Sequence, residues 1–232
     1  MYENYDLSFP TGQPAETIGE YTGKTFLWMT LGLMITFAVA IACWFTQAFV
    51  LLSVLQLPVL IVTLVLSFTM ASRIERMSVN AAKGIFVAFS VLMGLSMALV
   101  LPQFRLSSLV LVFFATALYF ALFGLYGYFT HRDLSGLRGI LFSGLIFLIL
   151  FHLFSRFIPG LAAFDRFVCL IGIAVFLAYT AYNTQKIRAY YHYYAGFPDM
   201  LEKASVFSAL QLYLDFLNLF LYLLRFLGRS RN

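Results

Sequence analysis

One carboxylate, Asp215, lies in the middle of an apolar stretch, residues 206–224, that is long enough to cross a bilayer. It belongs to a series of polar residues at steps of three and four, which share one helix face: Ser208, Gln211, Asp215, Asn218, Tyr222 and Arg225. A carboxylate at mid-membrane costs roughly 2.5–3.5 kcal/mol, and such residues usually mark an ion path, a proton site or a switch. We therefore expect this face to meet protein or water rather than lipid.

Structural roles remain open for the same residues. Asp215 could hold the helices together, either protonated or paired with an arginine. Gln211 and Asn218 suit interhelical hydrogen bonds, each worth about 0.6 kcal/mol, and the same structural role is open for Asn183 in the preceding apolar stretch. Arg225, at the end of the stretch, is expected to extend toward lipid headgroups.

The composition is that of an integral membrane protein. Hydrophobic residues make up 62% of the 232 residues and charged residues only 11%, whereas soluble domains carry about 25% charged residues. The net charge of +5 comes without a dense Lys/Arg run, so it suits loops beside anionic lipids and does not indicate nucleic-acid binding.

Seven apolar segments have the length that a bilayer demands, so we predict an all-α protein of seven transmembrane helices. They cover residues 25–47, 51–71, 84–101, 108–129, 138–155, 166–185 and 206–225. Six spans plus one suggest two triplets of helices. The domain organisation is then a polar N-terminal segment (1–23), a transmembrane domain (24–228) and a short tail (229–232). The N-terminal segment lacks the basic region of a signal peptide, so the first span should be retained.

Loop charge favours a cytoplasmic N-terminus. That orientation places on the cytoplasmic side Lys24, Arg73, Arg76, Lys83, Arg132, Arg138, Lys186, Arg188 and Lys203. The opposite side receives the smaller set of Arg105, Arg156, Arg166, Arg225, Arg229 and Arg231. The basic tail opposes this arrangement, and a re-entrant last segment would remove the conflict. We expect seven full spans.

The connection after the sixth span has structure of its own. Asp199 and Glu202, just after Pro198, have the spacing of a capping box, so a short helix is expected to begin there and continue into the last span. The tyrosine-rich segment 190–194 suits the aromatic belt at a membrane interface, although a binding role is also open.

Catalytic and metal-binding patterns are weak. None of His131, His152 and His192 has a second ligand three or four residues away, as zinc sites on helices do. Paired intramembrane aspartates are lacking, because Asp215 alone lies within a predicted span. We therefore expect neither an enzyme nor a bound cofactor.

Three passages resemble the bacterial branch of the Bax inhibitor family, the transmembrane Bax-inhibitor-motif proteins. They are TAYNTQKI (Thr180–Ile187), LYLDFLNLFLYLLR (Leu212–Arg225) and YGYFTHRDLSGLRG (Tyr126–Gly139), with KTFLWMTLGLMITF (Lys24–Phe37) as a weaker fourth. The resemblance extends from Lys24 to Gly228. It implies a seven-helix bundle in which the last helix is central and surrounded by the other six.

The resemblance also implies a function, because family members are described as pH-sensitive calcium leak channels. Their sensor is a pair of aspartates, in spans six and seven, with an arginine from span two nearby. The path closes when the carboxyls share a proton and opens when both ionise and repel. In this sequence Asp215 is present, but Asn183 stands where the family usually has the other aspartate. An amide cannot ionise, although it can donate a hydrogen bond to Asp215. The pH response should therefore be shifted or weakened.

Further expectations follow from the resemblance. Arg73 takes the role of the span-two counter-charge. Asp215 would make at most a weak, transient contact with calcium, because a full calcium site gathers 6–8 oxygen ligands. The expected setting is a bacterial inner (plasma) membrane, with the lipid bilayer and calcium or another cation as partners. The alternative is a non-conducting regulatory protein that binds another membrane protein, such as a protease.

Overall fold

The computed structural model describes residues 16–46, 49–158 and 160–229, and all long elements within these ranges are helices. They are α1 (Ile18–Phe45), α2 (Phe49–Arg73), α3 (Val79–Val100), α4 (Leu106–Phe129), α5 (Arg138–Phe154), α6 (Asp165–Tyr194) and α7 (Pro198–Leu227). Short 3-10 helices, η1 (Leu101–Gln103), η2 (Ser135–Leu137) and η3 (Leu161–Phe164), lie in three of the connections. Seven helices are long and apolar enough to cross a membrane. This confirms the predicted all-α fold of seven transmembrane helices.

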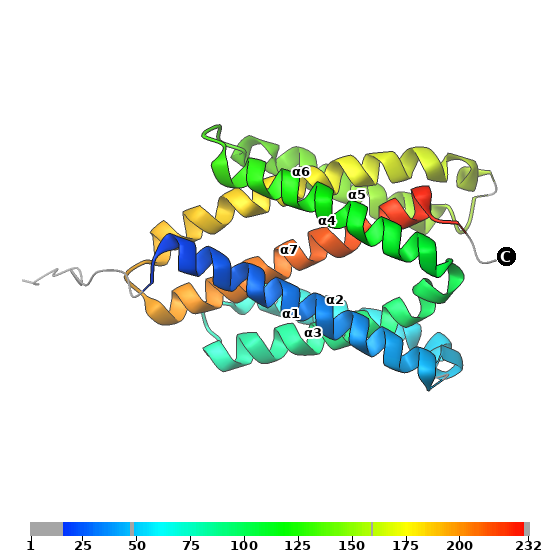
Figure 1. Ribbon diagram of the computed structural model, residues 1–232, viewed down its shortest axis with the longest axis horizontal. Helices are drawn as coiled ribbons and strands as arrows, with labels where there is room; N and C mark the ends of the chain where they lie inside the picture. Colours follow the sequence, from blue (N-terminus) through cyan, green and yellow to red (C-terminus); the bar gives the residue numbers. More distant parts are fainter. Residues whose placement is uncertain (1–15, 47–48, 159, 230–232) are drawn as a thin grey trace, which may run out of the picture.

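The helices form two groups of three, with α7 between them (Figure 1). Helices α1–α3 lie on one side and α4–α6 on the other. Helix α7 packs mainly on α6, α1, α4 and α3, whereas α2 packs mainly on α3 and α5 on α6. In the most apolar 18 residues of each helix, 72% of the α7 residues are buried, against 11% for α2 and for α5. The last helix is therefore the central one, as the family resemblance implied.

Aromatic rings that meet edge to face hold α7 in this position. Tyr213 of α7 contacts Phe86 and Phe89 of α3, with 5.9 Å between ring centroids in both pairs. On the opposite side, Phe216 contacts Phe120 of α4 at 5.5 Å. Such pairs contribute roughly 0.5–1.5 kcal/mol each beyond the area that they bury. Close packing of this kind matters in a membrane, because lipid tails are as apolar as the side chains and do not drive helices together.

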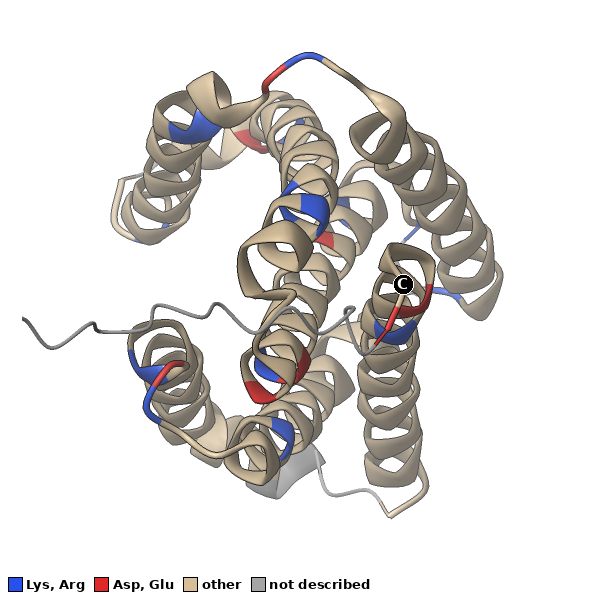
Figure 2. Ribbon diagram, turned by 90° about the vertical axis from the view of Figure 1, so that its left-hand side faces the viewer, with Lys and Arg blue, Asp and Glu red and all other residues tan. Residues whose placement is uncertain are grey.

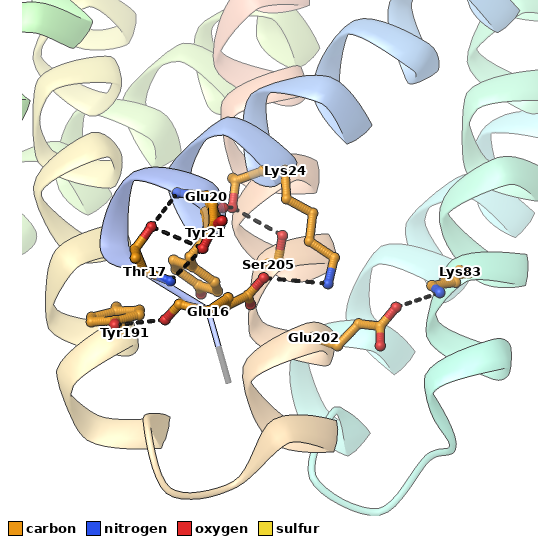
Figure 3. Close-up of polar contacts among 10 residues, drawn as sticks. Glu16, Thr17, Glu20, Tyr21, Lys24, Lys83, Tyr191, Glu202 and Ser205 are labelled. Carbon is orange, nitrogen blue, oxygen red and sulfur yellow. Dashed lines mark hydrogen bonds and ion pairs between the residues drawn. The ribbon is translucent and has the colours of Figure 1, made fainter. Parts of the chain in front are cut away.

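Helix α1 begins at Ile18 rather than at residue 25, because a capping box at its start satisfies free backbone N–H groups (Figure 3). The Thr17 side chain accepts a hydrogen bond from the backbone N–H of Glu20, and the Glu20 carboxylate accepts one from the backbone N–H of Thr17 at 2.7 Å. The structure thus extends the first helix into part of the predicted polar segment, residues 1–23. Residues 1–15 of that segment and residues 230–232 of the tail lie outside the described residues.

The predicted capping box after Pro198 is wrong. Helix α7 begins at Pro198 with Phe197 as its N-cap, and no side chain caps it. Glu202 instead forms an ion pair with Lys83 of α3 (Figure 3). A proline can begin a helix because its missing N–H is not needed in the first turn. The predicted helix start at this point and its continuation into the last span are confirmed, because α7 is one helix of 30 residues.

Figure 2 shows the end of the bundle where α1 and α7 begin and α6 ends, which we call the N-terminal end. Charged residues gather there at helix termini and in connections, with long uncharged stretches between them. This distribution is expected of helices whose middle parts lie in hydrocarbon.

Candidate functional site

Asp215 and Asn183 meet in the interior, where α7 crosses α6. The Asn183 side-chain amide donates a hydrogen bond of 2.7 Å to Oδ2 of Asp215. Asp215 is 4% exposed and Asn183 is 6% exposed. The structure thus brings together the two residues that the sequence singled out as a pair, and it holds the carboxylate away from the lipid-facing surface.

Small residues let the neighbouring helices approach closely enough to fix this pair. Gly172 of α6 lies against the ring of Tyr222, which a Cβ on the glycine would meet at 2.6 Å. Tyr222 also stacks on Phe176, with 5.8 Å between ring centroids. These contacts hold α6 against α7 on one side of the Asn183–Asp215 pair.

A cavity of about 810 Å³ between α5, α6 and α7 leads to Asp215. Its lining contains Arg138, Gly139, Phe142 and Leu145 of α5, Phe176, Tyr179, Tyr182, Asn183, Lys186 and Tyr190 of α6, and Gln211, Leu214, Asp215 and Asn218 of α7. Asp215 is buried, whereas Arg138, at the start of α5, is exposed. The cavity therefore extends from the N-terminal end of the bundle toward the carboxylate. At about 30 Å³ per water molecule it is large enough for water or a hydrated ion.

Two cations line this cavity together with the carboxylate. The Lys186 ammonium lies 5.4 Å from the ring centroid of Tyr182 and 5.2 Å from that of Tyr190. Neither Lys186 nor Arg138 belongs to an ion pair among the residues that the structure describes. Of the described residues in the lining, Asp215 alone is a carboxylate. The net charge around the cavity is therefore positive when Asp215 is ionised.

The structure does not bring Arg73 to Asp215. Arg73 is exposed at the last residue of α2 and lines a separate cavity with Arg76, Met77 and Ile85. Helix α2 packs mainly on α3 and lies at the edge of the bundle, so its end is remote from the centre of α7. The basic side chains that share a cavity with the carboxylate are Lys186 and Arg138 instead.

The predicted polar stripe of α7 faces the cavity only in its middle part. Gln211, Asp215 and Asn218 all line it. Asn218 donates a hydrogen bond to the Leu214 carbonyl at 2.8 Å, whereas Oε1 of Gln211 is buried and has no hydrogen-bond partner among the described residues.

The two ends of the stripe pack against protein. Ser208, one turn before Gln211, is buried, and its hydroxyl has no hydrogen-bond partner among the described side chains and backbone. Tyr222 is covered by α6, as described above. The Arg225 guanidinium donates hydrogen bonds to Asp165 at the start of α6 and to His152 of α5, and its extension toward lipid headgroups stays a prediction.

Five polar residues of the cavity were not assigned to the site from the sequence: Arg138, Tyr179, Tyr182, Lys186 and Tyr190. A signal for three of them exists, because Tyr179, Asn183, Lys186 and Tyr190 follow one another at steps of four, three and four. This is the spacing of a single helix face, and it matches the polar stripe that was recognised on α7. Arg138 has no such signal, since it lies at the start of its helix.

Metal-ligand groups do not cluster in this part of the molecule. Across residues 16–46, 49–158 and 160–229, no three His, Cys, Asp or Glu side chains come together as a metal site would require. A weak contact of calcium with Asp215 stays a prediction.

The fold and the cavity define a multi-pass helical membrane protein with a buried carboxylate beside its central helix. The sequence model of the family described as "Inhibitor of apoptosis-promoting Bax1" matches residues 19–232. The chain therefore belongs to the Bax inhibitor family.

Curated bacterial proteins are similar over most of this chain. The "Inner membrane protein YbhL" of Escherichia coli (strain K12) is 34% identical over 227 residues, which cover 94% of this chain and 95% of the relative. An uncharacterized protein of Rickettsia prowazekii (strain Madrid E) is 38% identical over 157 residues, covering 68% and 66%. Another, from Borreliella burgdorferi, is 29% identical over 217 residues, covering 92% and 93%.

Proposed function

We propose that this protein conducts a slow cation leak, with calcium as the permeant ion, along a path beside α7. The observation that carries the proposal is the cavity of about 810 Å³ that extends from the N-terminal end of the bundle to Asp215. Asp215 is the ionisable gate or ion contact, and Asn183 is its partner on α6. A carboxylate in the middle of a membrane helix is costly, and a role in moving ions accounts for that cost.

The pH response is weak in this proposal, because only one of the two gate residues can ionise. A pair of carboxylates switches between a shared proton and mutual repulsion. Asn183 instead donates the same hydrogen bond to Asp215 whether or not that carboxyl carries a proton. Titration of Asp215 changes the charge of the path, but it creates no repulsion that pushes α6 away from α7.

The orientation and setting are also part of the proposal. We place the N-terminus and the open end of the cavity in the cytoplasm, since the basic residues are more frequent in the connections at that end. We place the protein in a bacterial inner membrane, as the printed name of the Escherichia coli relative suggests. Lys186 replaces Arg73 as the counter-charge. The proposal includes no catalytic activity and no bound cofactor.

Calcium flux into liposomes that contain only the purified protein tests the proposal. The parent protein should give a slow leak that varies little between pH 6 and 8, a window of about two units around neutrality. Asp215→Asn, an isosteric change that removes the charge, should lower the flux at every pH. A steep response in the neutral range that survives Asp215→Asn would contradict the assigned role of the carboxylate.

The second candidate function is a non-conducting protein that regulates another membrane protein. The two cations Arg138 and Lys186, which line the same cavity as Asp215, favour this alternative, because they repel calcium. Flux separates the two functions. Liposomes in which the purified protein passes no cation at any pH would support the regulator.

A further inference from the structure

Arg138 and Lys186 are two positive charges that face one cavity, and neither forms an ion pair within 4 Å among the described residues. Arg138 comes from the start of α5 and Lys186 from the last third of α6, and both line the cavity that ends at Asp215. Lys186 is half-buried, and its ammonium lies against the rings of Tyr182 and Tyr190. Contact with tyrosine rings replaces only part of the hydration that such a cation loses.

Asp215 does not fill the role of counter-ion for both cations. It is a single charge, it lies deeper than either cation, and its Oδ2 already accepts the Asn183 hydrogen bond. The mouth of the cavity therefore keeps a net positive charge even when Asp215 is ionised. Like charges in a partly desolvated site repel strongly unless an anion is present.

We propose that the mouth of this cavity binds a phosphate group, held between the Arg138 guanidinium and the Lys186 ammonium. A guanidinium offers paired N–H donors that match two phosphate oxygens, and an ammonium adds a compact charge. The tyrosine hydroxyls in the lining can donate further hydrogen bonds to phosphate oxygens. The proposal does not depend on whether the protein conducts ions.

The position of the site favours a lipid headgroup as the source of that phosphate. The cavity opens at the N-terminal end of the bundle, next to the tyrosine-rich end of α6, where interfacial aromatic residues gather at headgroup level. Basic pockets between transmembrane helices bind phosphorylated headgroups in this setting. A free phosphate ester could enter from water at the same end, and experiment must distinguish the two sources.

Native mass spectrometry of the full-length protein in detergent measures this binding directly. Phosphatidylglycerol should bind to the parent protein more tightly than diacylglycerol, which has the same chains without the phosphate. The double variant Arg138→Gln/Lys186→Gln should bind phosphatidylglycerol about tenfold more weakly, which corresponds to about 1.4 kcal/mol. The matched variant Arg76→Gln/Arg132→Gln removes the same charge from the same end of the bundle but changes no residue that lines the Asp215 cavity. It should bind like the parent.

Competition with soluble glycerol phosphate identifies the source. If glycerol phosphate displaces the lipid at similar concentrations, the site recognises the free ester, and if it does not, the site is for a lipid headgroup. Equal binding of phosphatidylglycerol and diacylglycerol to the parent protein overturns the proposal, and this comparison needs no variant to fold. Equal losses in the two double variants also overturn it. Thermal unfolding of each variant without lipid shows whether a loss of binding reflects a loss of structure.

Discussion

Asn183 of α6 and Asp215 of α7 lie on antiparallel helices and are joined by a hydrogen bond of 2.7 Å in the buried centre of the bundle. The resemblance to other family members places a second aspartate at the position of Asn183. One amide therefore stands where a titrating partner is expected, and its hydrogen bond keeps the two helices in contact without a shared proton.

Asn183→Asp should make the leak steeply dependent on pH. With two carboxyls in hydrogen-bond range, one shared proton holds the helices together at low pH, and loss of that proton at higher pH leaves two like charges that repel. Calcium flux in liposomes should therefore be low in acid and should rise more steeply with pH than in the parent protein. If the flux of Asn183→Asp varies with pH no more than that of the parent, the dyad interpretation fails.

The matched control for this variant is Asn183→Asp combined with Asp215→Asn. This exchange keeps one carboxyl and one amide in contact but reverses their helices. It should restore the weak pH response, because a single carboxyl again has no like charge to repel.

Sequence reasoning predicted the number of spans but began the first helix too late and ended the sixth too early. Hydropathy identifies segments that lipid can surround, so the apolar middle of each helix was recognised. The last turns of α6 and the first turns of α7 are more polar, yet they are buried against protein, as Ile187 and Leu201 show at 0% and 1% exposure. Tyr191 even donates a hydrogen bond to the Glu16 carbonyl, before α1, at 2.8 Å (Figure 3). Contacts of this kind depend on tertiary structure and leave little trace in hydropathy.

The candidate site was predicted only in part, because some of its residues are brought together by tertiary contacts. Asp215 is conspicuous because a carboxylate in an apolar helix is costly, and a local motif marked Asn183. Lys186 was assigned to a loop, since a lysine near a helix end usually extends to the headgroups. Arg73 was assigned to the centre by resemblance alone, and only the packing of α2 on α3 shows that its end lies elsewhere.

Lys203 should contribute to stability through the backbone of the turn between α2 and α3. It is 6% exposed, and its ammonium donates hydrogen bonds of 3.2 Å to the carbonyls of Glu75 and Met77. Lys203→Met removes both bonds and should lower the free energy of unfolding by about 1–3 kcal/mol. Thermal unfolding in detergent measures the loss, and hydrogen exchange in residues 74–78 should increase.

The comparison for this variant is Lys83→Met, a change of the same kind in a partly exposed ion pair with Glu202. Such pairs contribute about 0–1 kcal/mol. Equal losses of unfolding free energy in the two variants would mean that the hydrogen bonds of Lys203 to the carbonyls stabilise the fold no more than the exposed ion pair does.

The contact between Arg225 and Asp165 should couple the end of α7 to the start of α6. Both side chains are about one-third exposed, 36% and 37%, so solvent screens their attraction and the coupling should be at most about 1 kcal/mol. A double-mutant cycle with Arg225→Gln and Asp165→Asn measures it from unfolding midpoints. The coupling should shrink as salt is raised. Zero coupling at low salt would show that the two side chains do not stabilise each other.

Gly127 of α4 should tolerate no side chain, because α4 and α6 touch there. A Cβ at this position would lie 2.1 Å from the backbone oxygen of Ala181, and backbone cannot move aside as a flexible side chain can. Gly127→Ala should therefore lower the free energy of unfolding by about 1–3 kcal/mol through overpacking. Gly84→Ala is the control, since a Cβ there meets nothing within 4 Å, and the higher helix propensity of alanine, about 1 kcal/mol, should leave stability unchanged or raised. Unfolding midpoints that rise in both variants would place α4 farther from α6 than the structure does.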